Sequence, residues 1–197
     1  MEENGTGFDV DKMRQDMRKV VMNRIGPELE IDYEIIEDFK ITKPESQRML
    51  SVIFIQNSAI TFNLQISYSI EDALFFSNFK ESGDKTTDEK KAMAKDFINE
   101  LCNMAGGGVK HLVEEEGIDS LISLPVSTRT EDQDLFRAHP KGTSRVIIDQ
   151  WMLEHSEGNH SILCYTKMEV LDEKAMKERI VPAFGGGDDA GGGVFFL

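Results

Sequence analysis

The chain has 197 residues, 40% hydrophobic and 29% charged, which is enough for one sizeable core and does not require two. Its formal net charge of −14 argues against nucleic acid or an anionic membrane as the main partner, because both need a basic surface. A basic patch on a protein partner is compatible with this charge. Two cysteines make no disulfide framework and no apolar run reaches membrane-spanning length, so we predict a cytoplasmic protein.

The N-terminal part of the chain predicts a flexible end followed by an amphipathic helix. Residues 1–8 are mostly small or acidic, so we expect them to be flexible. Asp9 is a suitable N-cap and Gly26-Pro27 a suitable stop signal. The apolar residues between these signals recur at helical spacing: Val10, Met13, Met17, Val20, Val21 and Ile25. We therefore predict a helix between the two signals.

Three β-strands are predicted next. Residues 30–41 mix apolar and acidic side chains, which is typical of an edge strand or an irregular strand. Residues 48–56 are largely apolar on both faces, and residues 60–68 alternate between apolar and polar side chains. Because only a short turn with Asn57-Ser58 separates these two runs, they predict a β-hairpin.

A short helix is predicted after the hairpin. Ser69 and Asp72 are three residues apart, which resembles a capping box and marks a helix start. We expect this helix to run to about Lys80 and to bury Ile70, Leu74 and Phe75. Residues 81–85 are predicted to form a loop.

The longest predicted helix starts at Thr86, where Glu89 repeats the capping signal. Its apolar residues form a face that should lie on the core: Met93, Phe97, Leu101, Met104, Val109, Leu112 and Val113. On another face, Glu100 and Asn103 are three residues apart, so one helical turn places a carboxylate beside an amide. This pair is the candidate functional site.

Three consecutive glycines, Gly106 to Gly108, interrupt this helical pattern, and each costs roughly 1 kcal/mol relative to alanine in a helix interior. One interpretation is that the helix ends near Ala105 and a second short helix carries Val109 to Glu116. The other is that the missing side chains let another backbone, from this chain or a partner, approach closely. The sequence leaves both interpretations open.

Three further strands are predicted in the C-terminal half. The run after Gly117 predicts a strand that ends near Pro125, and residues 131–142 are polar enough to form a loop. Residues 146–153 and 161–171 predict the last two strands. The turn-forming residues at 157–159 between them indicate a second hairpin.

The end of the chain predicts a short helix and a tail. Residues 172–180 can form the helix, which Pro182 should stop. We therefore predict one domain over residues 9–183 and a glycine-rich flexible tail over residues 184–197. The tail is interpreted either as disorder or as a tethered apolar-acidic peptide that raises the local concentration of a weakly bound partner.

Other reactive side chains indicate no chemistry of their own. His155 and His160 could be imagined as metal ligands, but they flank a predicted hairpin turn without a second cluster, which favours a solvated turn. Cys102 lacks the spaced histidine of a nucleophilic dyad, and no glycine loop has the strand context of a phosphate-binding motif. We expect this chain to bind no metal and no cofactor.

Glu100 and Asn103 remain, and such a pair on an exposed helix face usually consists of solvated polar residues only. The surrounding sequence strengthens a functional interpretation. Asparagine lowers helix propensity, and three glycines follow it. The segment therefore breaks local rules twice in one place, as functional sites do.

The residues around this pair resemble the CheX branch of the CheC/CheX/FliY family of chemotaxis phosphatases. Glu100-Leu-Cys-Asn103 matches the family's E-x-x-N signature, and residues 104–110 stand where the family tends to have a small, glycine-containing segment. Residues 122–126, ISLPV, look like its strand after that helix, and residues 60–76 like its preceding strand and helix.

The likeness covers roughly residues 31–171 and shows two departures from the family pattern. Gly108 stands where the family would have an asparagine, and the loop over residues 131–142 looks longer and more acidic. Both departures could alter the choice of partner, and neither touches the E-x-x-N pair.

The resemblance implies a phosphatase that hydrolyses the aspartyl phosphate of a CheY-like response-regulator receiver domain. The receiver would supply its own Mg²⁺ and a lysine beside the phosphoryl group. Asn103 would hold the attacking water in line with phosphorus, and Glu100 would pair with the receiver lysine. Only one such signature is visible, which implies one site per chain.

The resemblance also implies an α/β (α+β) sandwich, with a mainly antiparallel sheet and two long helices packed on one face, and a homodimer joined through its sheets. Two other functions stay open. The chain could be a non-catalytic module of the same fold that holds a receiver domain or a flagellar switch component. It could also be a general scaffold in which the E-x-x-N match arises by chance.

Overall fold

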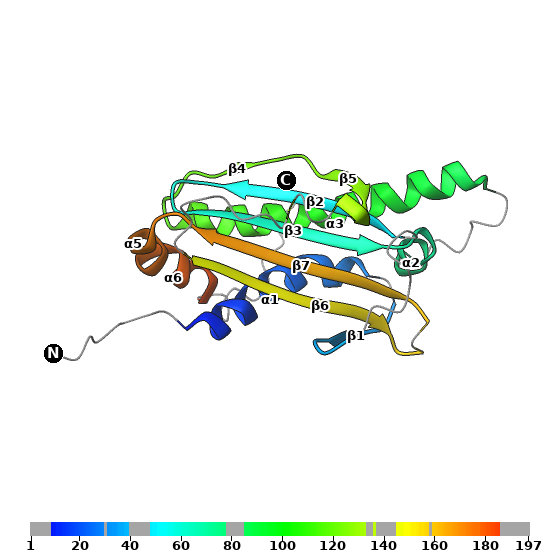
Figure 1. Ribbon diagram of the computed structural model, residues 1–197, viewed down its shortest axis with the longest axis horizontal. Helices are drawn as coiled ribbons and strands as arrows, with labels where there is room; N and C mark the ends of the chain where they lie inside the picture. Colours follow the sequence, from blue (N-terminus) through cyan, green and yellow to red (C-terminus); the bar gives the residue numbers. More distant parts are fainter. Residues whose placement is uncertain are drawn as a thin grey trace.

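The computed structural model describes residues 9–29, 31–39, 48–77, 85–132, 136, 145–157 and 159–185, and Figure 1 shows its architecture. Its strands are β1 (Tyr33–Ile36), β2 (Met49–Gln56), β3 (Ile60–Tyr68), β4 (Leu121–Ile122), β5 (Val126–Arg129), β6 (Arg145–His155) and β7 (Ser161–Val170). Its helices are α1 (Val10–Ile25), α2 (Ile70–Phe76), α3 (Thr87–Glu115), α5 (Glu173–Ala175) and α6 (Val181–Gly185). Short turns complete these elements: η1 (Gly26–Glu28), η3 (Thr130–Asp132) and the π-helical turn η4 (Met176–Ile180).

The described strands form one antiparallel seven-stranded sheet in the order β1-β6-β7-β3-β2-β4, and β5 also pairs with β2. Both predicted hairpins, β2–β3 and β6–β7, are confirmed. The predicted edge strand is confirmed as the short β1, which pairs only with β6 among the described strands.

The two long helices, α1 and α3, lie side by side against one face of the sheet (Figure 1). Asp9 caps α1 as predicted, because its carboxylate accepts hydrogen bonds from the backbone N–H groups of Asp11 and Lys12 at 2.9 and 3.1 Å. The core between helices and sheet is apolar and includes Met17, Val21, Ile53, Phe62, Leu64, Ile98, Val109 and Trp151. This is the α+β sandwich that the sequence predicts.

The other face of the central strands carries polar side chains that are buried as well. The polar residues that alternate along β3 lie on this face, where Gln65 is 1% exposed and donates a hydrogen bond to Asn63 at 3.1 Å. On β7, Lys167 and Glu169 form a buried ion pair. Burial of polar groups requires such partners, so pairing within this face lets it be buried despite its composition.

A partly buried ion pair attaches α1 to the sheet. Arg18 donates to both carboxylate oxygens of Asp149 on β6, at 2.8 and 2.7 Å, and also pairs with Glu37. Its guanidinium carbon lies 5.4 Å from the centre of the Trp151 ring. The hydrogen bonds to Asp149 raise the pKa of Arg18. This pair fixes the register of α1 on the strand that it covers.

Several predicted boundaries are wrong. The helix after Ser69 ends at Phe76 rather than near Lys80, and its most buried apolar residues are Ala73 and Phe76. Ile70, Leu74 and Phe75 are only half-buried against the core. The predicted loop over residues 81–85 lies outside the described residues except for its last residue.

Two elements that were predicted to end at prolines also differ from the prediction. The strand expected to end near Pro125 is two short strands on either side of it, β4 and β5, both paired with the outer edge of β2. Pro182 does not stop the last helix, because the wider π-helical turn precedes it and α6 continues to Gly185. Phe184 is buried, so ordered structure passes the predicted boundary at 183.

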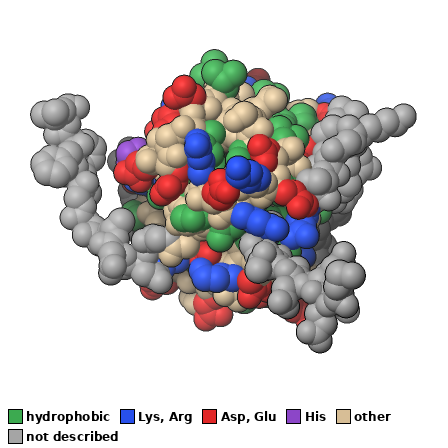
Figure 2. Space-filling model, turned by 90° about the vertical axis from the view of Figure 1, so that its left-hand side faces the viewer, with side chains coloured by type: hydrophobic (Ala, Val, Ile, Leu, Met, Phe, Trp, Pro, Cys, Tyr) green, Lys and Arg blue, Asp and Glu red, His purple; other side chains and the backbone are tan. Residues whose placement is uncertain are grey.

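The negative charge is not gathered on the end of the molecule that Figure 2 shows. Lys and Arg side chains lie among Asp and Glu side chains there. None of the described helices is long and apolar enough to cross a membrane.

Candidate functional site

The candidate site lies on α3, whose start is fixed by the predicted capping box. The Thr86 hydroxyl accepts from the Glu89 backbone N–H at 3.3 Å, and the Glu89 carboxylate accepts from the Thr86 backbone N–H at 2.7 Å. The Glu89 carboxylate accepts hydrogen bonds from the Thr86 backbone N–H and from the Thr86 hydroxyl, and these lower the pKa of Glu89. The helix then runs without interruption for 29 residues.

Glu100 and Asn103 lie side by side on the outer surface of this helix. Both side chains are exposed, and the Asn103 amide donates to the Glu100 carboxylate at 3.4 Å. A distance at the upper limit for a hydrogen bond indicates a weak contact. The two side chains are therefore adjacent, as the spacing predicts, and are free to turn toward another molecule.

The neighbouring positions explain why this pair faces outward. Ile98, Leu101, Cys102 and Ala105 are all buried against the core. At 3.6 residues per turn, positions between these buried ones must point away from the sheet. The most buried face is slightly rotated from the predicted one, since Met93, Phe97, Met104 and Leu112 are only half-buried.

The glycines do not end the helix, so the interpretation with two helices is wrong. A Cβ added at Gly106 would lie 2.8 Å from Ile53 Cδ1 and 3.1 Å from Ile122 Cδ1. A Cβ added at Gly108 would lie 2.7 Å from Arg24 Cγ. Close approach therefore occurs at both positions, and side chains of this chain rather than another backbone make it.

Gly107 differs from its two neighbours. A Cβ added there would meet no atom within 4 Å, and the residue is exposed. It follows Asn103 by four residues, so it lies on the same outward face one turn further along α3. Packing within the described structure gives no reason for a glycine here.

Asn99 anchors the helix that carries the site to the sheet, and the sequence analysis did not identify it. Its side-chain oxygen accepts from the Ser51 hydroxyl of β2 at 3.0 Å and from the Ser127 hydroxyl of β5 at 2.8 Å. These bonds hold α3 against the sheet one turn before Asn103. The only sequence signal was a polar residue near the apolar face, which names no partner.

Exposed apolar side chains lie along the outer edge of the sheet. Leu121 and Leu124 are 79% and 83% exposed, and Val126 is 47% exposed. They belong to β4, β5 and the link between them, which contacts α3 through Ile122 at Gly106. Together, Leu121, Leu124 and Val126 form what we call the apolar edge.

The two histidines near the second hairpin do not lie in a solvated turn. The His160 ring stacks on Phe75 at 3.9 Å between centroids, and its Nδ1 lies 3.0 Å from a carboxylate oxygen of the fully buried Asp72. His155 packs edge-on against the same Phe75 ring at 4.9 Å. No group of three potential metal ligands occurs among the described residues.

Neither cysteine has the surroundings of a nucleophile. Cys102 and Cys164 are both buried, and burial raises the pKa of each thiol far above its ordinary value. A nucleophilic cysteine needs its thiolate form and access to substrate. Both thiols are therefore structural, even though Cys102 lies between Glu100 and Asn103 in the sequence.

Solved structures share this fold at low sequence identity. A chain of the crystal structure of the CheX–CheY–BeF3–Mg²⁺ complex from Borrelia burgdorferi aligns with a TM-score of 0.57 and 17% identity, over 80% of this chain and 97% of that chain. A chemotactic CheC-like protein from Shewanella oneidensis aligns with a TM-score of 0.52 and 14% identity, over 79% and 96%. Chemotaxis protein CheX from Vibrio vulnificus gives 0.51 and 16%, over 80% and 99%.

No family model matches the sequence, and no curated protein matches it. The structural likeness spans nearly the full length of the proteins compared, and it includes a mainly antiparallel sheet with helices packed against it. The chain therefore has the CheC/CheX fold.

Proposed function

We propose that this protein accelerates hydrolysis of the aspartyl phosphate on a CheY-like receiver domain. The observation that carries the proposal is the exposed Glu100–Asn103 pair on α3, held together by only a 3.4 Å hydrogen bond. It stands in a fold shared with a chain of a CheX–CheY complex. Both side chains are free to engage a partner, as such a reaction requires.

The reaction needs little covalent chemistry from this chain. Water attacks phosphorus, the bond from phosphorus to the aspartate oxygen breaks, and inorganic phosphate and a carboxylate result. The receiver's Mg²⁺ and lysine would offset the charge on the phosphoryl oxygens. What a second protein can add is a positioned water, which converts a diffusive encounter into an oriented one.

Asn103 suits this positioning role. Its amide has both donor and acceptor atoms, so it can hold a water in a defined orientation, and it is too weak a base to remove the proton itself. Glu100 would pair with the receiver lysine and fix the register of α3 on the receiver. Each residue would then have one role, and the exposed helix would serve as a rigid support.

Two further features support docking of a protein. Gly107 leaves the helix backbone bare one turn after Asn103, where no atom of the described structure lies within 4 Å of the missing Cβ. The apolar edge on β4, β5 and the link between them offers exposed leucine side chains, and clustered exposed apolar residues mark interaction sites.

The proposal includes a cytoplasmic location and a homodimer joined through its sheets. Sedimentation equilibrium of the full chain would test the dimer. A monomer at all concentrations up to about 100 µM would remove the dimer from the proposal, because the dissociation constant would then be weaker than about 0.1 mM.

The experiment is a decay assay on a phosphorylated receiver with wild type, Glu100→Gln and the control Glu115→Gln. Glu115 is an exposed carboxylate in the last turn of the same helix, so the control removes an equal charge outside the site. Wild type and Glu115→Gln should accelerate decay equally. Glu100→Gln should need more protein for the same rate, and its defect should shrink at high salt because an exposed ion pair is screened.

Two results would count against the proposal. A salt-independent defect in Glu100→Gln would reject the lysine pairing. Binding of the receiver by wild type without any acceleration of decay would instead identify a non-catalytic module of the same fold.

A further inference from the structure

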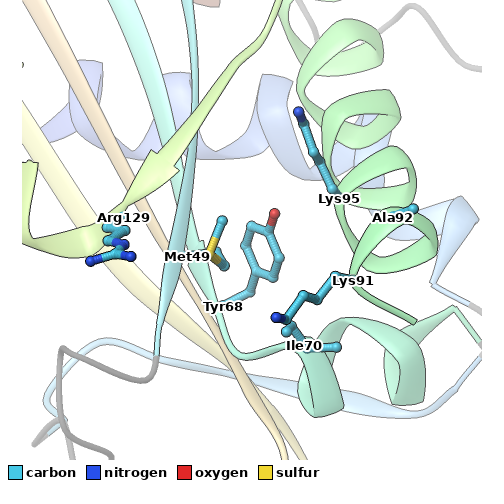
Figure 3. A pocket seen from close by; sticks show the side chains of 7 residues that line it. All are labelled: Met49, Tyr68, Ile70, Lys91, Ala92, Lys95 and Arg129. Carbon is cyan, nitrogen blue, oxygen red and sulfur yellow. The ribbon is translucent and has the colours of Figure 1, made fainter. Parts of the chain in front are cut away.

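A second site opens where α3, the start of α2 and the sheet meet. Seven residues line a pocket of about 340 Å³: Met49, Tyr68, Ile70, Lys91, Ala92, Lys95 and Arg129 (Figure 3). This volume lies at the lower end of the range for small-molecule sites. The pocket contains neither Glu100 nor Asn103.

The inner walls of the pocket are apolar, with one exception. Met49, Ile70 and Tyr68 are the lining residues from β2, the start of α2 and β3. Tyr68 is 1% exposed, and among the described residues its hydroxyl makes no hydrogen bond of normal geometry. The neighbouring Ser51 hydroxyl donates to Asn99 and also interacts with the Tyr68 hydroxyl.

The Tyr68 hydroxyl lies between the sheet and α3 in Figure 3. Leaving a buried hydroxyl without a partner costs free energy. Burial also raises the pKa of Tyr68, so the hydroxyl keeps its proton and can donate. A ligand oxygen in the pocket would provide a well-aligned acceptor for this hydroxyl.

The rim of the pocket is cationic. Lys91 and Lys95 are one helical turn apart on α3, and Arg129 reaches the pocket from β5. Lys95 and Arg129 have no ion pair within the described parts of the chain, and Lys91 has only a 3.9 Å contact with the exposed Asp88. In a chain of net charge −14, three cations around one cavity are a local reversal of charge.

We propose that this pocket binds a small organic anion, in which a carboxylate or phosphate group lies at the rim that Lys91, Lys95 and Arg129 line and an apolar or aromatic body lies against Met49, Ile70 and Tyr68. The Tyr68 hydroxyl donates to the anion or to a polar atom beside it. Arginine and lysine together suit such a group, because arginine orients oxygen atoms and lysine adds a compact charge.

This site is independent of the proposed phosphatase activity. Lys95 precedes Asn103 by eight residues, which corresponds to about 12 Å along a helix axis. The two sites therefore share one rigid helix without sharing a residue. Asn99 and its two serine partners lie between them along α3.

The test is an NMR titration of the full-length, isotope-labelled chain at constant ionic strength. Four probes are compared: phenyl phosphate, benzoate, inorganic phosphate and benzyl alcohol. We expect phenyl phosphate or benzoate to bind saturably and to shift the amide signals of the pocket residues. The tighter of these two probes identifies the anionic group. Inorganic phosphate, which lacks the apolar body, and benzyl alcohol, which lacks the charge, should both bind at least tenfold more weakly.

Variants separate the contributions of the pocket residues. Lys95→Met and Arg129→Met should each weaken binding of the tighter anion by about tenfold, as expected for loss of one charged hydrogen bond. Tyr68→Phe should weaken it by about fivefold while leaving the stability of the free protein nearly unchanged, because among the described residues the lost hydroxyl makes no hydrogen bond of normal geometry. Lys177→Met removes an exposed lysine outside the pocket and should change nothing.

Three results would overturn the proposal. The first is absence of saturable binding of both organic anions up to about 10 mM, well above the range of specific small-ligand sites. The second is equal binding of inorganic phosphate or benzyl alcohol. The third is an equal loss of affinity in Lys177→Met, which would indicate that net charge alone attracts the probes.

Discussion

Replacing each of the three glycines of α3 by alanine adds one methyl group and tests how the structure packs at that position. Alanine at Gly107 adds a Cβ that meets no atom within 4 Å. Because alanine is about 1 kcal/mol more favourable than glycine within a helix, Gly107→Ala should raise the free energy of unfolding by about that amount. For a domain of this size the melting temperature should rise by about 2–4 °C.

The same change at Gly106 should have the opposite sign. The new Cβ would lie 2.8 Å from Ile53 Cδ1, and Ile53 is fully buried. Overpacking of a core costs about 1–3 kcal/mol, which exceeds the gain in helix propensity, so we expect a net loss of about 1 kcal/mol. Gly108→Ala should lie between the two, because the exposed Arg24 side chain can move away.

Urea unfolding of the three variants, followed by circular dichroism, would give these free energies. The predicted order of stability is Gly107→Ala, then Gly108→Ala, then Gly106→Ala. If receiver docking uses the bare turn, Gly107→Ala should also weaken receiver binding while it stabilises the fold. A Gly107→Ala variant no more stable than Gly106→Ala would refute the continuous, outward-facing helix.

Three further predictions concern the core and the helix start. Arg18→Met should lower the free energy of unfolding by about 3 kcal/mol, because it leaves the buried Asp149 carboxylate unpaired, and a loss below about 1 kcal/mol in thermal unfolding would contradict this. Cys102 and Cys164 should react with a thiol reagent at neutral pH only after unfolding, since burial raises both pKa values; rapid labelling of the native protein would show the thiols to be accessible. The pKa of Glu89 is lowered in the folded state, so the Glu89 carboxylate should stabilise the fold at pH values above the ordinary glutamate pKa. This stabilisation should be lost as the pH falls through the lowered pKa of the folded state. A difference in stability between wild type and Glu89→Gln that persists in acid would contradict this prediction.

Much of the fold could be predicted because local signals were strong and mutually consistent. Asp9 and Thr86 cap their helices as predicted, and the helical spacing of apolar residues between Asp9 and Gly26 matches α1. Such signals depend on neighbours within a few residues, which a sequence shows directly. The two hairpins follow from the same kind of local pattern.

The errors arise where a distant partner overrides a local preference. Glycine costs helix propensity at Gly106, yet the helix continues because Ile53 and Ile122 fill the space beside it. Lys167 would be placed in water by its type, but the adjacent Glu169 lets it be buried. A local pattern does not show which residues will be brought together by the fold.

The candidate site likewise contains a part that local spacing predicts and a part that depends on distant residues. The adjacency of Glu100 and Asn103 follows from helical spacing, and the structure bears out that geometry. Asn99 could not be found in this manner, because its partners Ser51 and Ser127 are 48 and 28 residues away in the chain. The pocket around Tyr68 likewise joins residues from α2, α3 and three strands.

The central claim is that Asn103 positions the attacking water, and the most direct measurement is the decay rate of a phosphorylated receiver at saturating protein for wild type and Asn103→Ala. Asn103 is exposed and alanine favours a helix, so the variant should be at least as stable as wild type and should still bind the receiver. The account predicts that the saturated rate falls by about 10²-fold. An unchanged saturated rate in Asn103→Ala would contradict it.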